Sequence, residues 1–192
     1  MLTLGHFYFI KDQFFIDYPD RYLMKNKEVV AGVLHHRPCF FTFLDASTGL
    51  YWMIPISSQL SKFKPIAEKK AIKYGGTCDT IVFGDVLGYE KAFLIQNMFP
   101  IIDSYVDSEY KDSRALISVE VNKILEAELI TKAKKVLALQ RGGGKFIFPN
   151  VIEIEQDLLT KLPQIYILFS QKSITYILDA HNKNDLSIWK YV

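Results

Sequence analysis

The chain has 192 residues, of which 49% are hydrophobic, 14% aromatic and 23% charged, a composition typical of a globular protein. A chain of this length buries about 70% of its surface on folding, so it needs no disulfide framework, and we expect Cys39 and Cys78 to be reduced thiols. No apolar run approaches the roughly 20 residues of a membrane-spanning helix, and the N-terminus lacks the basic start of an export signal. We therefore expect a single-domain protein of the cytoplasm, residues 1–192, that is not an integral membrane protein.

The formal net charge of +2 hides a segregated distribution. Residues 1–75 carry a net +4, residues 76–131 a net −6, residues 132–150 a net +5 and residues 151–192 a net −1. If the two basic segments share one face, they form a local positive field suited to a polyanion. The alternative is that these cations only solvate the end of a helix, where cations are favoured in any protein.

The predicted elements follow from residue type, periodicity and turn signals. Aromatic and β-branched runs predict strands, and apolar residues at helical spacing predict two helices that end at glycine pairs or triplets. In chain order, we expect strands at 6–10, 14–16, 29–34, 39–44 and 50–56, a helix at 62–74, strands at 80–83 and 92–95, a long helix near 114–139, and strands at 146–148, 151–152, 165–169 and 174–178. Strands without regular strand-helix alternation predict an α+β fold, with helices packed on a mostly antiparallel sheet.

Three familiar kinds of site fit the sequence poorly. The RGGGK segment at 141–145 lacks the Ser/Thr and the spacing of a phosphate-binding P-loop, and it follows a helix. His35 and His36 are neighbours in an extended segment, so their side chains point to opposite faces and cannot both bind one metal ion. Cys39 lies among aromatic residues, where a thiol is buried and unreactive.

A serine pair follows the aromatic strand at 50–56. Ser57 and Ser58 come directly after it, with Lys62 and Lys64 close behind. Hydroxyls and a nearby ammonium can hold a phosphate and offset the charge that develops when phosphorus becomes five-coordinate. The alternative is that the serines only cap the helix that follows.

An upstream loop carries Tyr22, Lys25 and Lys27. A phenol and two amines could supply the acid-base groups that attack by an RNA 2′-hydroxyl requires. The alternative is an ordinary lysine-rich surface loop.

With these residues in view, the sequence resembles the toxins of type III toxin–antitoxin systems, in the ToxN, AbiQ, CptN and TenpN group, and is most similar to the CptN branch. Several blocks in the same order carry the resemblance, and together they cover about residues 5–155. They are FFIDYPD (14–20), YLMKNK (22–27), YWMIPISS (51–58), CDTI (78–81), AFLIQNMFP (92–100) and KKVLALQR (134–141). Residues 156–192 extend beyond the resemblance, and we assign them no role.

The resemblance implies a fold similar to that of the Kid, MazF and CcdB toxins, in which a twisted antiparallel sheet closes partly into a barrel. It implies an endoribonuclease that cuts single-stranded RNA without a metal or other cofactor, through the 2′-hydroxyl, and leaves a cyclic phosphate. The implied partner is an RNA antitoxin of pseudoknot repeats that assembles with the toxin into a closed ring. The implied role is abortive infection against phage, with neither DNA nor a membrane as a partner.

Carried over residue by residue, the resemblance assigns Ser57 and Ser58 to the scissile phosphate. It assigns Lys27 to the transition state or a proton relay, Tyr22 to its positioning, and Lys62 to the lysine that follows the serines. Lys25 competes with Lys27 for the upstream role, and Lys62 lies further from the serines than in ToxN. The candidate RNA-binding residues are Lys25, Lys64, Lys132, Lys135, Arg141 and Lys145. The alternative function is a non-catalytic RNA-binding module of the same fold, because no residue stands out as a general base.

Overall fold

The computed structural model describes residues 2–24, 26–30 and 32–162. Lys25 and the strands expected at 165–169 and 174–178 lie outside the described residues. In chain order the elements are β1 (Phe7–Ile10), α1 (Asp12–Asp17), β2 (Lys27–Val30), β3 (Val33–His36), β4 (Cys39–Asp45), β5 (Leu50–Ser57), α2 (Leu60–Lys73), β6 (Val82–Val86), β7 (Tyr89–Phe93), η1 (Ile95–Asn97), β8 (Phe99–Ile101), η2 (Asp103–Tyr105), β9 (Val106–Glu109), α3 (Lys123–Arg141) and α4 (Val151–Lys161).

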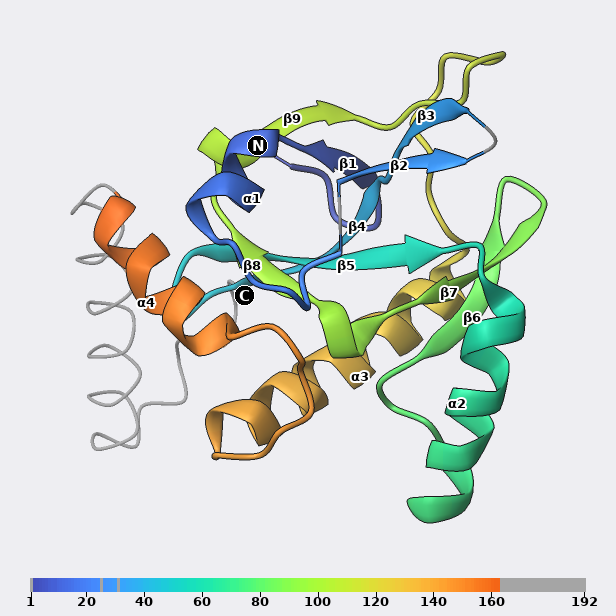
Figure 1. The fold of residues 1–192 in the computed structure, drawn as a ribbon, viewed down its shortest axis with the longest axis vertical. Helices are drawn as coiled ribbons and strands as arrows, with labels where there is room; N and C mark the ends of the chain where they lie inside the picture. The colour runs from blue at the N-terminus through green and yellow to red at the C-terminus, as the bar shows by residue number, and fades with distance from the viewer. Residues whose placement is uncertain (1, 25, 31, 163–192) are drawn as a thin grey trace, which may run out of the picture.

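The described strands confirm the expected α+β fold with an antiparallel sheet. Seven strands form one sheet in the order β6-β7-β5-β4-β1-β9, with β8 paired to the first half of β5, while β2 and β3 form a separate hairpin (Figure 1). β5 is the central strand, because its first half pairs with β8 and its last residues pair with β7. The described sheet is not closed, so the expected partial barrel is not confirmed.

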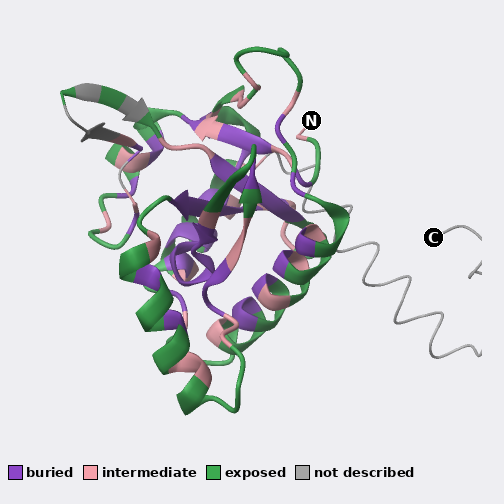
Figure 2. Ribbon diagram, turned by 90° about the vertical axis from the view of Figure 1, so that its right-hand side faces the viewer, coloured by how far each residue is buried: buried purple, intermediate pink, exposed green. Residues whose placement is uncertain are grey.

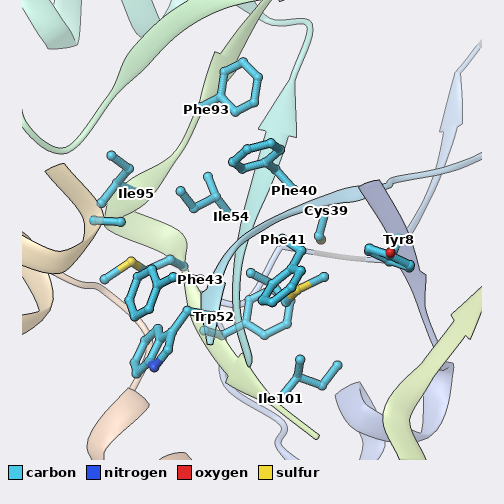
Figure 3. Packing of buried hydrophobic residues seen from close by; sticks show 14 of the residues in the cluster. Tyr8, Cys39, Phe40, Phe41, Phe43, Trp52, Ile54, Phe93, Ile95 and Ile101 are labelled. Carbon is cyan, nitrogen blue, oxygen red and sulfur yellow. The ribbon is translucent and has the colours of Figure 1, made fainter. Parts of the chain in front are cut away.

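The sheet is nevertheless strongly curved. β1 and β7 are separated by two strands, so in a flat sheet they would lie about 14 Å apart. The rings of Phe7 on β1 and Phe93 on β7 have centroids 6.2 Å apart, and both pack edge-on against Phe40 of β4. Figure 3 shows Phe40 and Phe93 beside each other in this core. The curvature brings β1 and β7 toward a common interior.

The β4–β5 hairpin supplies the centre of the core, as its aromatic composition predicts. Trp52 and Met53 are fully buried, and Trp52 stacks on Phe43 with the ring planes 16° apart. Helices then cover the sheet: α3 contacts β4, α4 contacts β8 and β5, and α2 contacts β7. Figure 2 shows the helices buried on one side and exposed on the other. The predicted helix at 62–74 is confirmed as α2.

Two predictions near the N-terminus are wrong. Residues 14–16 belong to helix α1 instead of a strand, because Phe14 is buried against Phe99, with ring centroids 5.0 Å apart, and this packing outweighs the strand propensity of aromatic residues. The strand expected at 29–34 is a hairpin of β2 and β3, since Gly32 turns the chain at a φ of 79°.

Three predictions in the second half are also wrong. The long helix begins at Lys123 and not near 114, because the side chain of Asn122 caps it by accepting from the Leu125 N–H, while Asp112 accepts the N–H groups of Arg114 and Ala115 in a preceding turn. The segment at 151–152 is the start of helix α4, and residues 146–148 form no strand. Val151, Ile154 and Leu158 are buried on one face of α4, at the helical spacing that the strand prediction missed.

The cysteines agree with the expectation of free thiols. Neither Cys39 nor Cys78 forms a disulfide, and burial raises the pKa of the Cys39 thiol to about 12. Among the described residues, no helix combines the length and the apolar character needed to cross a membrane.

Candidate active site

A cavity of about 680 Å³ opens at the carboxyl end of β5 and contains the serine pair. Its walls come from the end of β3, the β3–β4 connection, the end of β5, the β6–β7 hairpin and the segment after β9. The lining residues are His36, Arg37, Pro38, Ile56, Ser57, Ser58, Gln59, Val86, Leu87, Tyr89, Lys91 and Tyr110.

Strand register explains why these residues meet. Cys39 pairs with Pro55 in the β4–β5 hairpin, so the residues just before β4 lie beside the end of β5. On the other side of β5, Ser57 pairs with Ala92 of β7, and this register places Lys91 next to Ser58. The Lys91 ammonium donates a hydrogen bond to the Ser58 hydroxyl, with 2.7 Å between Nζ and Oγ.

The two serines have different environments. Ser57 is buried, and its Oγ accepts the N–H of Gln59 at 3.2 Å, which shapes the turn into α2. Ser58 is exposed. The N-cap residue of α2 is Gln59, and the helix has no side-chain cap. Helix capping therefore does not account for the Ser58 hydroxyl, which points to a lysine in an open cavity.

The cavity is an electropositive site. Arg37 and Lys91 line it with permanent positive charges, and none of its described lining residues is acidic. Helix α2 begins at Leu60, immediately after the serine pair, and has no acidic residue in its first turn, so the positive end of its dipole adds to this field. Such a field favours an anion beside Ser58.

His36 is held by the base of the β2–β3 hairpin. It pairs with Lys27 in the register of the two strands, and its ring packs edge-on against Phe9. Asp12 binds the Lys27 ammonium and accepts from the Asn26 side chain at 2.8 Å; these hydrogen bonds keep the pKa of Asp12 below its ordinary value. Lys27 therefore lies near the cavity through its strand partner but does not line it.

Other candidate residues lie outside the cavity lining. The Tyr22 ring packs against Phe148 with centroids 5.9 Å apart, and its hydroxyl accepts from Arg21. Lys62 lies on the first turn of α2, with its ammonium over the Phe63 ring. Lys64, also on α2, forms an ion pair with Glu90. Of the five residues proposed for catalysis, the structure places only Ser57 and Ser58 in the cavity.

The proposed RNA-binding residues of α3 have local partners. Lys132 binds Glu128 at 2.7 Å, and Lys135 binds Asp79 at 2.6 Å. Arg141 bridges Asp45 and the buried Glu155; burial opposes its charge, but these two carboxylates raise the pKa of the guanidinium. Lys145 is exposed in the segment between α3 and α4. The positive charge of this segment is thus partly neutralised within the fold.

The site also contains residues that the sequence analysis missed: His36, Arg37, Tyr89, Lys91 and Tyr110. His36 and Arg37 could have been found from the predicted β4–β5 hairpin. A hairpin places the residues just before its first strand next to those just after its second strand. Among the described residues, no three His, Cys, Asp or Glu side chains gather as a set of metal ligands.

A comparison with models of known protein families finds no match to this chain, and a comparison with curated proteins finds none either.

Proposed function

We propose that the chain is a metal-independent endoribonuclease that cleaves single-stranded RNA through the 2′-hydroxyl. The observation that supports this most is the Ser58–Lys91 pair in a cavity that Arg37 and His36 also line and whose described lining has no acidic residue. These are the groups that a phosphodiester needs for binding, charge stabilisation and proton transfer.

In the proposed mechanism, the scissile phosphate replaces solvent beside Ser58. The Ser58 hydroxyl and the Lys91 ammonium donate hydrogen bonds to its non-bridging oxygens, and Arg37 adds positive charge. Both cations stabilise the phosphorane more than the ground state, because the phosphorane carries one more negative charge. Ser57 keeps the turn in place through Gln59 and acts as a positioning residue.

His36 supplies the proton acceptor in this scheme. The imidazole takes the proton of the 2′-hydroxyl, the 2′ oxygen forms a bond to phosphorus, and the bond from phosphorus to the 5′ oxygen breaks. The departing 5′ oxygen takes a proton from solvent in the open cavity. The products are a 2′,3′-cyclic phosphate and a 5′-hydroxyl. Lys27 positions the hairpin that carries His36, through Asp12.

The wider biological assignment rests on the sequence resemblance. We propose that the chain is the toxin of a type III system, is inhibited by a pseudoknot RNA antitoxin in a closed assembly, and acts in the cytoplasm in phage defence. The strong curvature of the sheet is compatible with the partial barrel of the Kid, MazF and CcdB toxins. Tyr22, Lys62 and the exposed Lys145 are proposed to contact RNA beyond the cleaved bond.

The test is cleavage of a random single-stranded RNA pool in excess EDTA by the native chain and by Ser58→Ala. We expect the native chain to cut at preferred sequences and Ser58→Ala to lose most of this activity while keeping its thermal midpoint. RNA binding without cleavage by the native chain would favour the non-catalytic module. If the native chain neither binds nor cleaves RNA, the proposal is refuted.

A further inference from the structure

The tip of the β6–β7 hairpin forms an apolar part of the same cavity. Val86, Leu87 and Tyr89 line it, and Figure 1 shows the β6–β7 hairpin projecting past the end of β5, where the chain turns into α2. Leu87 is 44% exposed and Tyr89 is 70% exposed. Two large apolar side chains are therefore presented to solvent next to the phosphate-binding groups.

The backbone at this tip is strained. Val86 pairs with Tyr89, so Leu87 and Gly88 form a two-residue turn, with φ values of 56° and 82°. Such a turn favours Asn or Asp followed by Gly, because positive φ is unfavourable for a residue with a large side chain. Leu87 gains little burial in return for this strain. Burial within the fold therefore offsets only part of this strain, and contact of the Leu87 side chain with a ligand would offset more of it.

Tyr89 connects this tip to the phosphate site. Residues 89 and 91 are two apart on β7, so their side chains share one face of the strand. The Lys91 ammonium lies 5.8 Å from the centre of the Tyr89 ring and 2.7 Å from the Ser58 hydroxyl. A group stacked on Tyr89 would lie next to a phosphate bound at Ser58.

We propose that Leu87 and Tyr89 form a nucleobase subsite, which holds the base of a nucleotide adjoining the scissile phosphate. This proposal rests on the proposed function and extends it. A nucleobase is flat and joined to a phosphate by one sugar, which matches an exposed ring and an apolar side chain beside a phosphate site. Recognition of unpaired RNA uses such stacking on exposed aromatic rings. The hairpin tip would then help to decide which sequences are cut.

The experiment measures binding of a short 2′-O-methyl oligoribonucleotide, which cannot be cleaved through the 2′-hydroxyl, by fluorescence anisotropy. It uses the full chain, with Tyr89→Ala and Leu87→Asn. Loss of one stacked base weakens binding about 5-fold to 150-fold, and we expect Tyr89→Ala to lie in this range. We expect Leu87→Asn to weaken binding and also to raise the thermal midpoint, because asparagine tolerates positive φ.

Leu116→Asn is the matched control. Leu116 is the other described non-glycine residue at positive φ, at 55°, is 74% exposed and does not line the cavity. We expect this variant to gain stability with unchanged RNA binding. A series of oligonucleotides, each with one abasic position, completes the test. When the abasic position is the one that the tip holds, Tyr89→Ala should not weaken binding any further.

Native-like binding by both Tyr89→Ala and Leu87→Asn, with Ser58→Ala still inactive in cleavage, would overturn the nucleobase subsite and leave the proposed function standing. If the native chain binds RNA in a base-dependent way but does not cleave it, and Tyr89→Ala loses this binding, the subsite is supported and the nuclease activity is refuted.

Discussion

Replacement of Lys91 by glutamine removes the cation nearest to the proposed scissile phosphate. A phosphate that accepts hydrogen bonds from Ser58 and Lys91 would have its phosphorus about 4 Å from the Lys91 ammonium, where one unit of charge contributes about 4 kcal/mol at an effective dielectric constant of about 20. Because Lys91 is only half-buried, solvent reduces this value, and we take about 3 kcal/mol for the phosphorane. The expected loss in kcat/KM is therefore about 100-fold.

The assay is single-turnover cleavage of one defined RNA by Lys91→Gln, with Lys73→Gln as the control for total charge. Lys73 lies on the last turn of α2, outside the cavity lining, with its ammonium over the Tyr74 ring. We expect Lys73→Gln to cleave at the native rate and Lys91→Arg to recover part of the activity. Equal rates for Lys91→Gln and the native chain would refute the assignment of Lys91 to the phosphate site.

Three further predictions concern the rest of the fold. Arg141→Ala leaves the buried Glu155 without its partner, so it should lower the free energy of unfolding by about 3 kcal/mol and the thermal midpoint by about 10 °C. Lys135→Ala, which breaks a surface pair on the same helix, should have little effect on either. Equal thermal midpoints for the two variants would contradict this. Only Cys78 should react rapidly with a thiol reagent in the native protein, since Cys39 is buried and the pKa of its thiol is raised. Rapid reaction of two thiols per chain would contradict this. Hydrogen bonds from Tyr105, Tyr18 and His6 lower the pKa of Asp17, Asp157 and Glu109 below ordinary values of 3.8 for aspartate and 4.5 for glutamate. The unfolded chain binds more protons below these values, so stability measured by urea unfolding should rise with pH through this window and fall on acidification; a flat profile between about pH 3 and pH 5 would contradict this.

The sequence predicted elements well where local signals agree with the packing. The β4–β5 hairpin has an aromatic face and a turn rich in small polar residues, and α2 has helical periodicity followed by Gly75 and Gly76. Predictions were wrong where tertiary packing decided the outcome. The aromatic residues 14–16 became helical because Phe14 packs on Phe99, far away in the chain.

The serine pair could be selected from the sequence because hydroxyls, a strand end and nearby lysines occur within eight residues. His36 and Arg37 could also have been predicted, because the predicted hairpin already placed the residues before Cys39 near Ser57. Lys91 could not be predicted in this way, because no local sequence signal indicates that β7 pairs with the end of β5. The ion pairs of Lys135 and Arg141 were equally hidden, since their partners Asp79 and Asp45 are distant in sequence. Charge counted along the chain therefore overstated the positive field of α3.

The most direct measurement uses one RNA with a single cleavage site and its analogue with a 2′-deoxynucleotide 5′ to the cleaved bond, with the ends of the products analysed. Our account predicts that the native chain leaves a 2′,3′-cyclic phosphate and a 5′-hydroxyl, and that the deoxy analogue stays intact at that bond. Cleavage of the analogue at the native rate, or products with a 3′-hydroxyl and a 5′-phosphate, would contradict attack by the 2′-hydroxyl.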